Sequence, residues 1–293
     1  MKPARYIVAI PVSLMMLCGC SDSNDPLPEP ELRLPDLVAS ITSERSEEEF
    51  IYDDENRIVK WTSSSKFKDD IISCSYKYPD DNTITMDLLD KTVFSASQTQ
   101  TRHHDVRLTL DNDGLVTVAD AIFNGTEYNG IELRKKYRHE FEYDDNGHLV
   151  RITMTEWNAG NAGWDMDHPW QWVNTLTWDG DNLIRYEDSH GSNKPRIIQE
   201  YSYSGIPVAQ HKPIAFPIIN AGYIPLQLTG RFGKQTAGEV MGETVTYSNG
   251  QRNHNGYEYE FTTTATGTII SRYWKRRDDG TELEYRIKWI RSR

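Results

Sequence analysis

The chain has 293 residues, a net charge of −12 and 11% aromatic residues, among them 16 Tyr and 8 Trp. This length allows one large or two small domains with a buried core. The acidic balance excludes a nucleic-acid-binding protein, which needs clustered Lys and Arg. The abundance of aromatic residues, Gly and Asn favours strands and turns over helices.

Residues 1–19 have the layout of a lipoprotein signal peptide. Lys2 and Arg5 precede an apolar stretch, Tyr6 to Leu17, that is too short to span a bilayer. Residues 17–20 read LCGC and resemble the bacterial lipobox, in which the last cysteine is lipidated. The resemblance implies cleavage before Cys20 and acylation of Cys20. Each methylene group of the acyl chains that is buried in the membrane adds about 0.8 kcal/mol of membrane affinity. The alternative is an ordinary signal peptide that happens to end in Cys.

Residues 20–35 are expected to form the lipidated Cys20 and a tether. The segment SDSNDPLPEPELRLP, residues 21–35, is polar, acidic and rich in Pro, so we expect it to be extended and solvated. Asp22 and Asp25 resemble the acidic export tags of surface lipoproteins in Bacteroidetes. The expected location is therefore the bacterial outer membrane, with the protein lipid-anchored on either the periplasmic or the cell-surface face.

From residue 36 to 293 we expect a single all-β domain built from repeated hairpins. Two segments align without a gap, EFIYDDENRIVKWT at 49–62 and EFEYDDNGHLVRIT at 140–153. Aromatic residues two apart predict a strand with one buried face. Asn56 and Gly147 occupy the same place in the two copies and favour the positive φ of a tight turn. The Asp at the turn entry accepts hydrogen bonds from backbone amides, so these acids are interpreted as turn residues and not as calcium ligands.

Shorter copies follow along the chain. LTLDNDGLVTV at 108–118 and LTWDGDNLIRY at 176–186 place Gly114 and Asn182 just before a second strand. Their spacing is too irregular for a solenoid. The sequence therefore predicts an antiparallel meander of roughly fourteen to eighteen strands that forms a large twisted sheet or an open or partly closed barrel.

The pattern (Y/W)-D-x-x-G-x-L-x-x-I in these hairpins resembles the tyrosine–aspartate repeats of Rhs-type shell proteins. With the lipobox, the acidic tether and the late insertion GYIPLQLTGRFGK at 222–234, the arrangement resembles a Bacteroidetes lipoprotein family of unknown function with a porin-like fold. The resemblance implies a scaffold over about residues 36–293 and carries no activity with it. A transmembrane barrel is not expected, because outward positions hold charged residues, as in TELEYRIKW at 281–289. The apolar segment 214–228 is expected to cover one end or plug an open barrel.

Patterns of catalytic and metal-binding residues are not evident, and no cofactor or metal is expected. Cys74 shares the parity of Ile72 and Tyr76, which predicts a small buried hydrophobe without a disulfide partner. His103 and His104 are adjacent, so on a strand their rings face opposite sides and do not share a metal.

One segment, WNAGNAGWDMDHPWQW at 157–172, is a candidate ligand-binding loop, because flat rings beside carboxylates stack on sugar faces. Its candidate residues are Trp157, Trp164, Asp165, Asp167, Trp170 and Trp172. The alternative is that the tryptophans end and begin strands and fill the core. Two functions follow: a non-enzymatic envelope module that binds a glycan, a peptide or a protein partner, or a glycan-acting hydrolase with carboxylates near this loop. The lack of a catalytic constellation favours the first; the oligomeric state stays undefined.

Overall fold

The computed structural model describes residues 37–95, 98–126, 132–160, 163–164, 169–190, 195–207, 221–264 and 267–292. They belong to one compact unit, Leu34–Arg293. Its elements are β1 (Leu37–Ser43), β2 (Ser46–Tyr52), β3 (Ile58–Ser65), β4 (Ile71–Asp80), β5 (Thr83–Ser95), β6 (Gln98–Leu110), β7 (Val116–Thr126), β8 (Glu132–Tyr143), β9 (Leu149–Gly160), β10 (Gly163–Trp164), β11 (Trp170–Asp179), β12 (Asn182–His190), β13 (Ile197–Pro207), α1 (Tyr223–Leu228), β14 (Gly238–Tyr247), β15 (Arg252–Thr264), β16 (Gly267–Arg277) and β17 (Glu282–Ile290).

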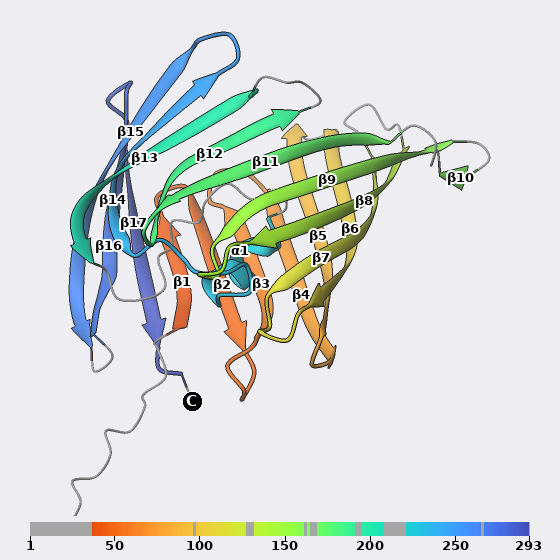
Figure 1. Ribbon diagram of the computed structural model, residues 1–293, viewed down its shortest axis with the longest axis horizontal. Coiled ribbons are helices and arrows are strands. Elements are labelled where there is room, and N and C mark those ends of the chain that lie inside the picture. Colours follow the sequence, from red (N-terminus) through yellow and green to blue (C-terminus); the bar gives the residue numbers. More distant parts are fainter. Residues whose placement is uncertain are drawn as a thin grey trace, which may run out of the picture. The chain divides into compact units, whose positions relative to one another are not determined.

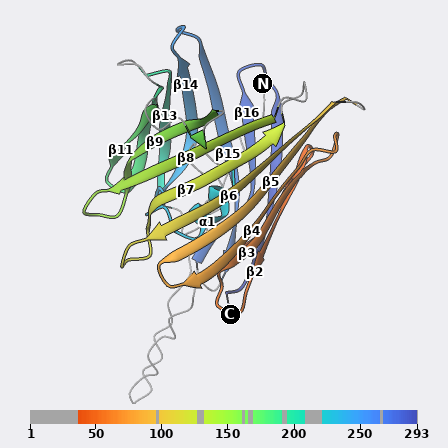
Figure 2. The same ribbon diagram turned by 90° about the vertical axis from the view of Figure 1, so that its right-hand side faces the viewer.

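The strands form an antiparallel meander that closes into a barrel (Figures 1 and 2). The short β10 pairs with β9, while β11 continues the meander from β9. The first strand, β1, pairs with both β2 and β17, and Leu37 lies opposite Ile290. In the part of the chain that the structure describes, sixteen strands thus close on themselves, which confirms the predicted all-β meander and selects the barrel over the open sheet.

The two faces of the barrel wall differ in chemistry. On β6 the inward positions Val106, Leu108 and Leu110 are buried, whereas the outward positions between them are exposed. Cross-strand ion pairs cover the outward face; examples are Asp120–Arg138 at 3.3 Å, Arg185–Glu200 at 2.9 Å and Arg276–Glu258 at 3.2 Å. The alternation follows from the period of two in a strand with one buried face. Among the described residues, no helix is long and apolar enough to cross a membrane.

The Asp-rich turns at one end of the barrel have a shared geometry. Asp53 Oδ1 accepts hydrogen bonds from the amides of Glu55 and Arg57 at 3.0 and 2.9 Å. Asp111 and Asp144 make the same pair of bonds to the residues two and four positions later. Residue four of each turn has positive φ, 62° at Asn56, 78° at Gly114 and 81° at Gly147. The acids therefore serve the turns, as the sequence predicts; this end is called the Asp-turn end.

The β11–β12 turn departs from that scheme. The positive φ, 54°, falls on Gly180, and Asn182 is already the first residue of β12. The expectation that Asn182 takes the place of Gly114 is therefore wrong, because the turn is shorter and the chain re-enters the sheet sooner. The Asn182 side chain instead accepts a hydrogen bond from the amide of Gly238 at 2.6 Å.

Aromatic side chains fasten neighbouring strands together at the Asp-turn end. Each lies in the second half of one strand and donates from its hydroxyl or indole N–H to a backbone carbonyl near the start of the strand before it in the meander. Seven such bonds, of 2.5–2.9 Å, occur among the described residues: Tyr52–Val38, Tyr78–Ile58, Tyr143–Val116, Trp178–Leu149, Tyr203–Leu183, Tyr259–Val240 and Trp289–Ile270. The hairpin between β5 and β6 has Leu110 at this place. The aromatic–acid phrase thus encodes two neighbouring devices, an aromatic latch and an Asp turn.

A plug formed by residues 221–237, between β13 and β14, fills the barrel at the Asp-turn end (Figures 1 and 2). Its apolar side chains Tyr223, Leu226, Leu228 and Phe232 are each at most 2% exposed. Backbone bonds tie the plug to the turns: the Val116 amide donates to Arg231 at 2.8 Å, the Lys234 amide to Gly147 at 2.9 Å and the Ala237 amide to Asp181 at 2.8 Å. The predicted plug is confirmed for residues 221–228, while 214–220 lie outside the described residues.

Candidate functional site

A cavity of about 410 Å³ lies inside the barrel, away from the Asp-turn end. Its wall comes from β4, β5, β6, β7 and β8, and Ala221 at the start of the plug also lines it. The lining side chains are of two kinds. The apolar ones are Ile72, Leu88, Phe123, Leu133 and Ala221, and the polar ones are Asp90, Gln100, Arg102, His104, Lys135 and Tyr137. We call this the lumen cavity.

Strand register explains why these charged groups face inward. Asp90 lies directly opposite Arg102, and Ile72 lies opposite Asp90. Arg102 shares the parity of the buried Val106 and Leu108 on β6. Nearer the plug the inward-facing side chains are apolar, whereas at the lumen cavity they include charged groups. Charged residues at core positions of strands are a sequence signal for such a site, although the hairpin pattern alone did not reveal it.

Two ion pairs bring opposite charges together inside the lumen. Arg102 contacts Asp90 at 3.4 Å and donates to the Gln100 side chain at 2.9 Å. Lys135 contacts Glu156, on β9, at 2.6 Å. The Arg102 side chain is 43% exposed, so the cavity reaches solvent, whereas the Glu156 side chain is only 13% exposed. The cavity therefore contains both positive and negative side chains, which are partly shielded from solvent.

Two histidines lie in this region as neutral rings. Burial, with a smaller contribution from Arg102 and His103, lowers the pKa of His104 to about 4. Burial also lowers the pKa of His139 to about 3. His139 Nδ1 lies 3.0 Å from the Tyr223 hydroxyl of the plug, while its Nε2 has no hydrogen-bond partner within the described chain. His104 and His139 thus add polarity to the lumen without charge at neutral pH.

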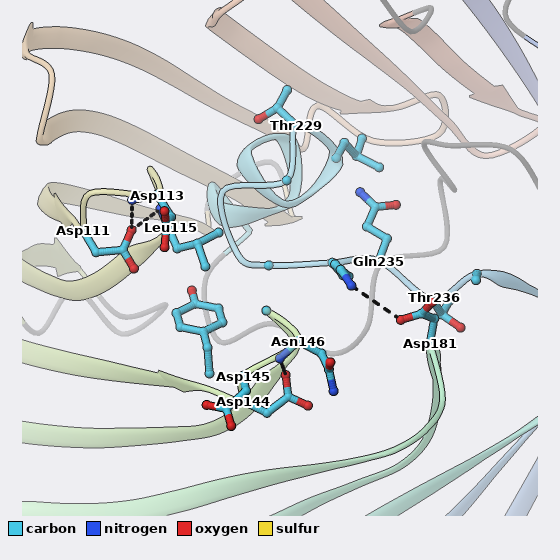
Figure 3. A pocket seen from close by; sticks show the side chains of 17 residues that line it. Asp111, Asp113, Leu115, Asp144, Asp145, Asn146, Asp181, Thr229, Gln235 and Thr236 are labelled. Carbon is cyan, nitrogen blue, oxygen red and sulfur yellow. Dashed lines mark hydrogen bonds and ion pairs between the residues drawn. The ribbon is translucent and has the colours of Figure 1, made fainter.

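A second hollow, the turn cleft, lies at the Asp-turn end between the plug and three turns (Figure 3). It measures about 970 Å³ and is lined by Asp111, Asp113, Asp144, Asp145 and Asp181. Asp111 and Asp144 are held by turn amides, as described above. These two acids thus stabilise the turns themselves, so the turn cleft is the weaker candidate for ligand binding.

His148 joins two of the turns that line the turn cleft. It is 2% exposed, and its two ring nitrogens lie 3.0 Å from Asp144 Oδ2 and 2.9 Å from Asp181 Oδ1. Its ring stacks on Trp178, with centroids 4.5 Å apart. Hydrogen bonds from the His148 amide and ring lower the pKa of Asp144. His148 therefore acts as a clamp between the β8–β9 and β11–β12 turns.

The structure separates the tryptophans of the predicted loop. Trp170 lies opposite Glu156, which lies opposite Tyr137, so Trp170 shares the inward face with the lumen cavity. Trp172 has the same parity and lies opposite Met154. Trp157 faces outward, where its ring lies 5.5 Å from Lys136 Nζ. Trp164 belongs to β10, and Asp165 and Asp167 lie outside the described residues. The glycan-binding role of this set stays a prediction.

The structure also places Cys74, His103 and His104, which the sequence analysis considered. Cys74 is 1% exposed, and burial raises the pKa of its thiol to about 12, as expected for an unreactive core residue. His103 faces outward and His104 inward, as predicted. Outside the barrel, His103 lies 2.8 Å from Asp87 and 3.8 Å from Asp105, in a small exposed cluster.

Comparison with known proteins identifies the fold and nothing finer. No family model matches the chain, and no curated protein matches its sequence. A crystal structure of a porin-like protein from Bacteroides uniformis is similar, with 13% identity and a TM-score of 0.50, covering 87% of this chain and 98% of that one. A porin-like protein from Bacteroides vulgatus aligns with 10% identity and a TM-score of 0.42, covering 87% and 99%. The likeness to the Bacteroides uniformis protein shows that the chain has a porin-like fold.

Proposed function

We propose that this protein is a lipid-anchored, non-enzymatic binding protein of the bacterial outer membrane that holds a small ligand in its barrel lumen. The observation that carries the proposal is the lumen cavity: charged and polar side chains gather inside the barrel, around about 410 Å³ of space, on the side of the plug away from the Asp-turn end. The plug fills the other end with buried apolar side chains. A blind cavity of this kind favours binding over passage.

The outward face supports an anchored barrel over an inserted one. A barrel in a lipid bilayer shows lipid an apolar band, and a charge at mid-depth costs about 2–4 kcal/mol. Here cross-strand ion pairs such as Asp120–Arg138 and Arg185–Glu200 lie on that face. Membrane attachment is therefore assigned to Cys20, in keeping with the likeness of residues 1–20 to a lipoprotein signal. The likeness of the hairpins to tyrosine–aspartate repeats concerns the barrel scaffold.

Detergent phase separation tests the anchor. The full chain, expressed in a bacterium that lipidates proteins, is expected in the detergent phase of Triton X-114. The Cys20→Ala variant is expected in the aqueous phase, because the ion pairs on the outward face of the described barrel disfavour its entry into lipid. Recovery of Cys20→Ala in the detergent phase would show that the barrel itself enters the membrane and would contradict the proposal.

Native mass spectrometry tests the lumen as a binding site even while the ligand is unidentified. The protein purified from its own bacterium is expected to carry a small molecule that Leu133→Trp lacks, because the larger ring fills the cavity that Leu133 lines. Glu132→Trp is the matched control, since Glu132 is the exposed neighbour on β8 that faces outward. Equal ligand occupancy in both variants, or no bound molecule in the wild type, would contradict lumen binding.

The hydrolase alternative finds less support. Glycoside hydrolysis needs one carboxyl group that is protonated and one that is ionised. At the lumen cavity the carboxylates Asp90 and Glu156 each lie in an ion pair, with Arg102 and with Lys135, so the geometry there is one of two separate ion pairs and not of two carboxyl groups facing a shared substrate. A binding role is accordingly preferred for the lumen.

A further inference from the structure

We infer that the ligand of the lumen cavity is a small zwitterion with an apolar side group, such as a short peptide with free ends. This inference rests on the proposed function and specifies its ligand. It follows from how the two charged pairs and the apolar residues are distributed in the cavity.

The Asp90–Arg102 pair is poised to exchange partners. Its closest contact, 3.4 Å between Arg102 Nη1 and Asp90 Oδ2, is long for a charge-assisted hydrogen bond, which is usually about 2.7–2.9 Å. Gln100 holds the other terminal nitrogen of Arg102 at 2.9 Å, which orients the guanidinium. Asp90 Oδ1 has a further long contact, 3.4 Å, from the Thr92 hydroxyl. A ligand carboxylate therefore finds an oriented guanidinium, and a ligand ammonium finds a carboxylate beside it.

The balance of charge selects a zwitterion over a simple ion. The two ion pairs at the lumen cavity comprise two cations, Arg102 and Lys135, and two anions, Asp90 and the adjacent Glu156. An anionic ligand that reached both cations would also meet both carboxylates, and a cationic ligand would meet both cations. A ligand that carries both charges replaces Arg102–Asp90 with two new pairs and leaves no charge alone in a partly dry cavity.

The apolar part of the cavity accounts for the side group. Phe123 contacts His104, with ring centroids 4.9 Å apart, and Tyr137 lies 6.5 Å from Phe123. Gly125 separates Arg102 from Leu133 in the same row of the wall and contributes no side chain there. Leu133 and the neighbouring apolar residues of the cavity extend this surface. An apolar side group fits this part of the cavity, whereas a sugar hydroxyl group placed against these apolar residues would be left without a hydrogen-bond partner.

Calorimetric titration of the mature protein with one dipeptide and its capped forms tests the inference. Leu-Leu with free ends is expected to bind. Its N-acetyl and C-amide forms are each expected to bind at least about tenfold more weakly, since a hydrogen bond to a charged group contributes about 1.5–3 kcal/mol and about 1.4 kcal/mol is tenfold. Arg102→Gln should weaken binding of free Leu-Leu but not of its amide, and Asp90→Asn should weaken free Leu-Leu but not its N-acetyl form.

The outward pair Asp120–Arg138 provides the control, because Arg138→Gln removes a comparable cation from the other face of the wall. Binding by Arg138→Gln is expected to match the wild type. If Leu-Leu and its capped forms bind equally, or if only an uncharged disaccharide such as cellobiose binds in the cavity, the zwitterion inference is wrong and the binding function stands. If Leu133→Trp leaves every such titration unchanged, the lumen function itself is wrong.

Discussion

At the scale of single residues, His139 shows how much polarity the barrel tolerates beside its plug. The ring is 3% exposed, and one nitrogen has no hydrogen-bond partner among the described residues. An unpaired buried polar group costs about 1–3 kcal/mol. The Tyr223 hydroxyl, 3.0 Å from Nδ1, is the polar contact that joins this ring to the plug.

The buried state of His139 predicts a loss of stability in acid. Its pKa is lowered to about 3 in the folded protein, against about 6.5 in an unfolded chain. Protons therefore bind the unfolded chain preferentially between these values, and the contribution of this residue is full above about pH 6.5 and falls as pH drops towards about 3. The slope for one proton is about 1.4 kcal/mol per pH unit. Urea unfolding at pH 7, 5.5 and 4.5 is expected to show a smaller acid loss for His139→Gln, which keeps an acceptor for Tyr223. Parallel pH profiles would contradict this.

The residues whose roles are predictable from the sequence are those with a local cause. Asp53 and Asp144 accept bonds from amides within four residues, and Asn56 and Gly147 take the positive φ of the same turns. The lumen cavity was missed because its charged groups come from separate strands. Only the closed wall brings Asp90, Arg102 and Lys135 to one space, although each already occupied a core-parity position in its strand.

At the scale of elements, the aromatic latches explain why Tyr and Trp, and not Phe, occupy one place in the repeats. Each side chain buries its ring and places one polar group on a backbone carbonyl of the neighbouring strand. Burial raises the pKa of Tyr203 to about 12, so its hydroxyl stays protonated and remains a donor at neutral pH. The sequence predicted the buried rings, but the polar role of their tips depends on strand pairing that the hairpin pattern alone does not define.

The latch predicts a modest and specific effect of removing one hydroxyl. Tyr143 donates to the Val116 carbonyl at 2.7 Å, and Tyr143→Phe deletes that bond while keeping the ring. The expected loss, measured by urea denaturation, is about 1 kcal/mol of unfolding free energy, since the carbonyl is left without this donor. Tyr247→Phe, at the end of β14 and away from the latches, is the matched control and is expected to unfold like the wild type. Equal loss in both variants would refute the latch.

At the scale of the whole molecule, the hairpins were predictable and the closure was not. Every pairing from β2 to β17 joins strands that follow one another in the meander, whereas β1 and β17 lie at opposite ends of it. Nothing local in the sequence marks Ile41 and Ile287 as partners, yet both are buried and directly opposed. Closure removes the two edges that an open sheet of this size would expose. It also creates an interior, without which the lumen charges would be ordinary surface groups.

Closure through β17 therefore predicts that the barrel fails as a unit when that strand is removed. Deletion of residues 282–293 exposes the edges of β1 and β16 and uncovers Ile41 on the core side. The truncated protein is expected to elute as aggregates in size-exclusion chromatography and to lose its cooperative thermal transition by circular dichroism. Deletion of residues 291–293 alone, beyond the last residue of β17, is the matched control and is expected to behave as the full barrel. A monomeric, cooperatively unfolding 282–293 deletion would mean that the remaining strands are stable as an open sheet, and that the lumen does not depend on the β1–β17 seam.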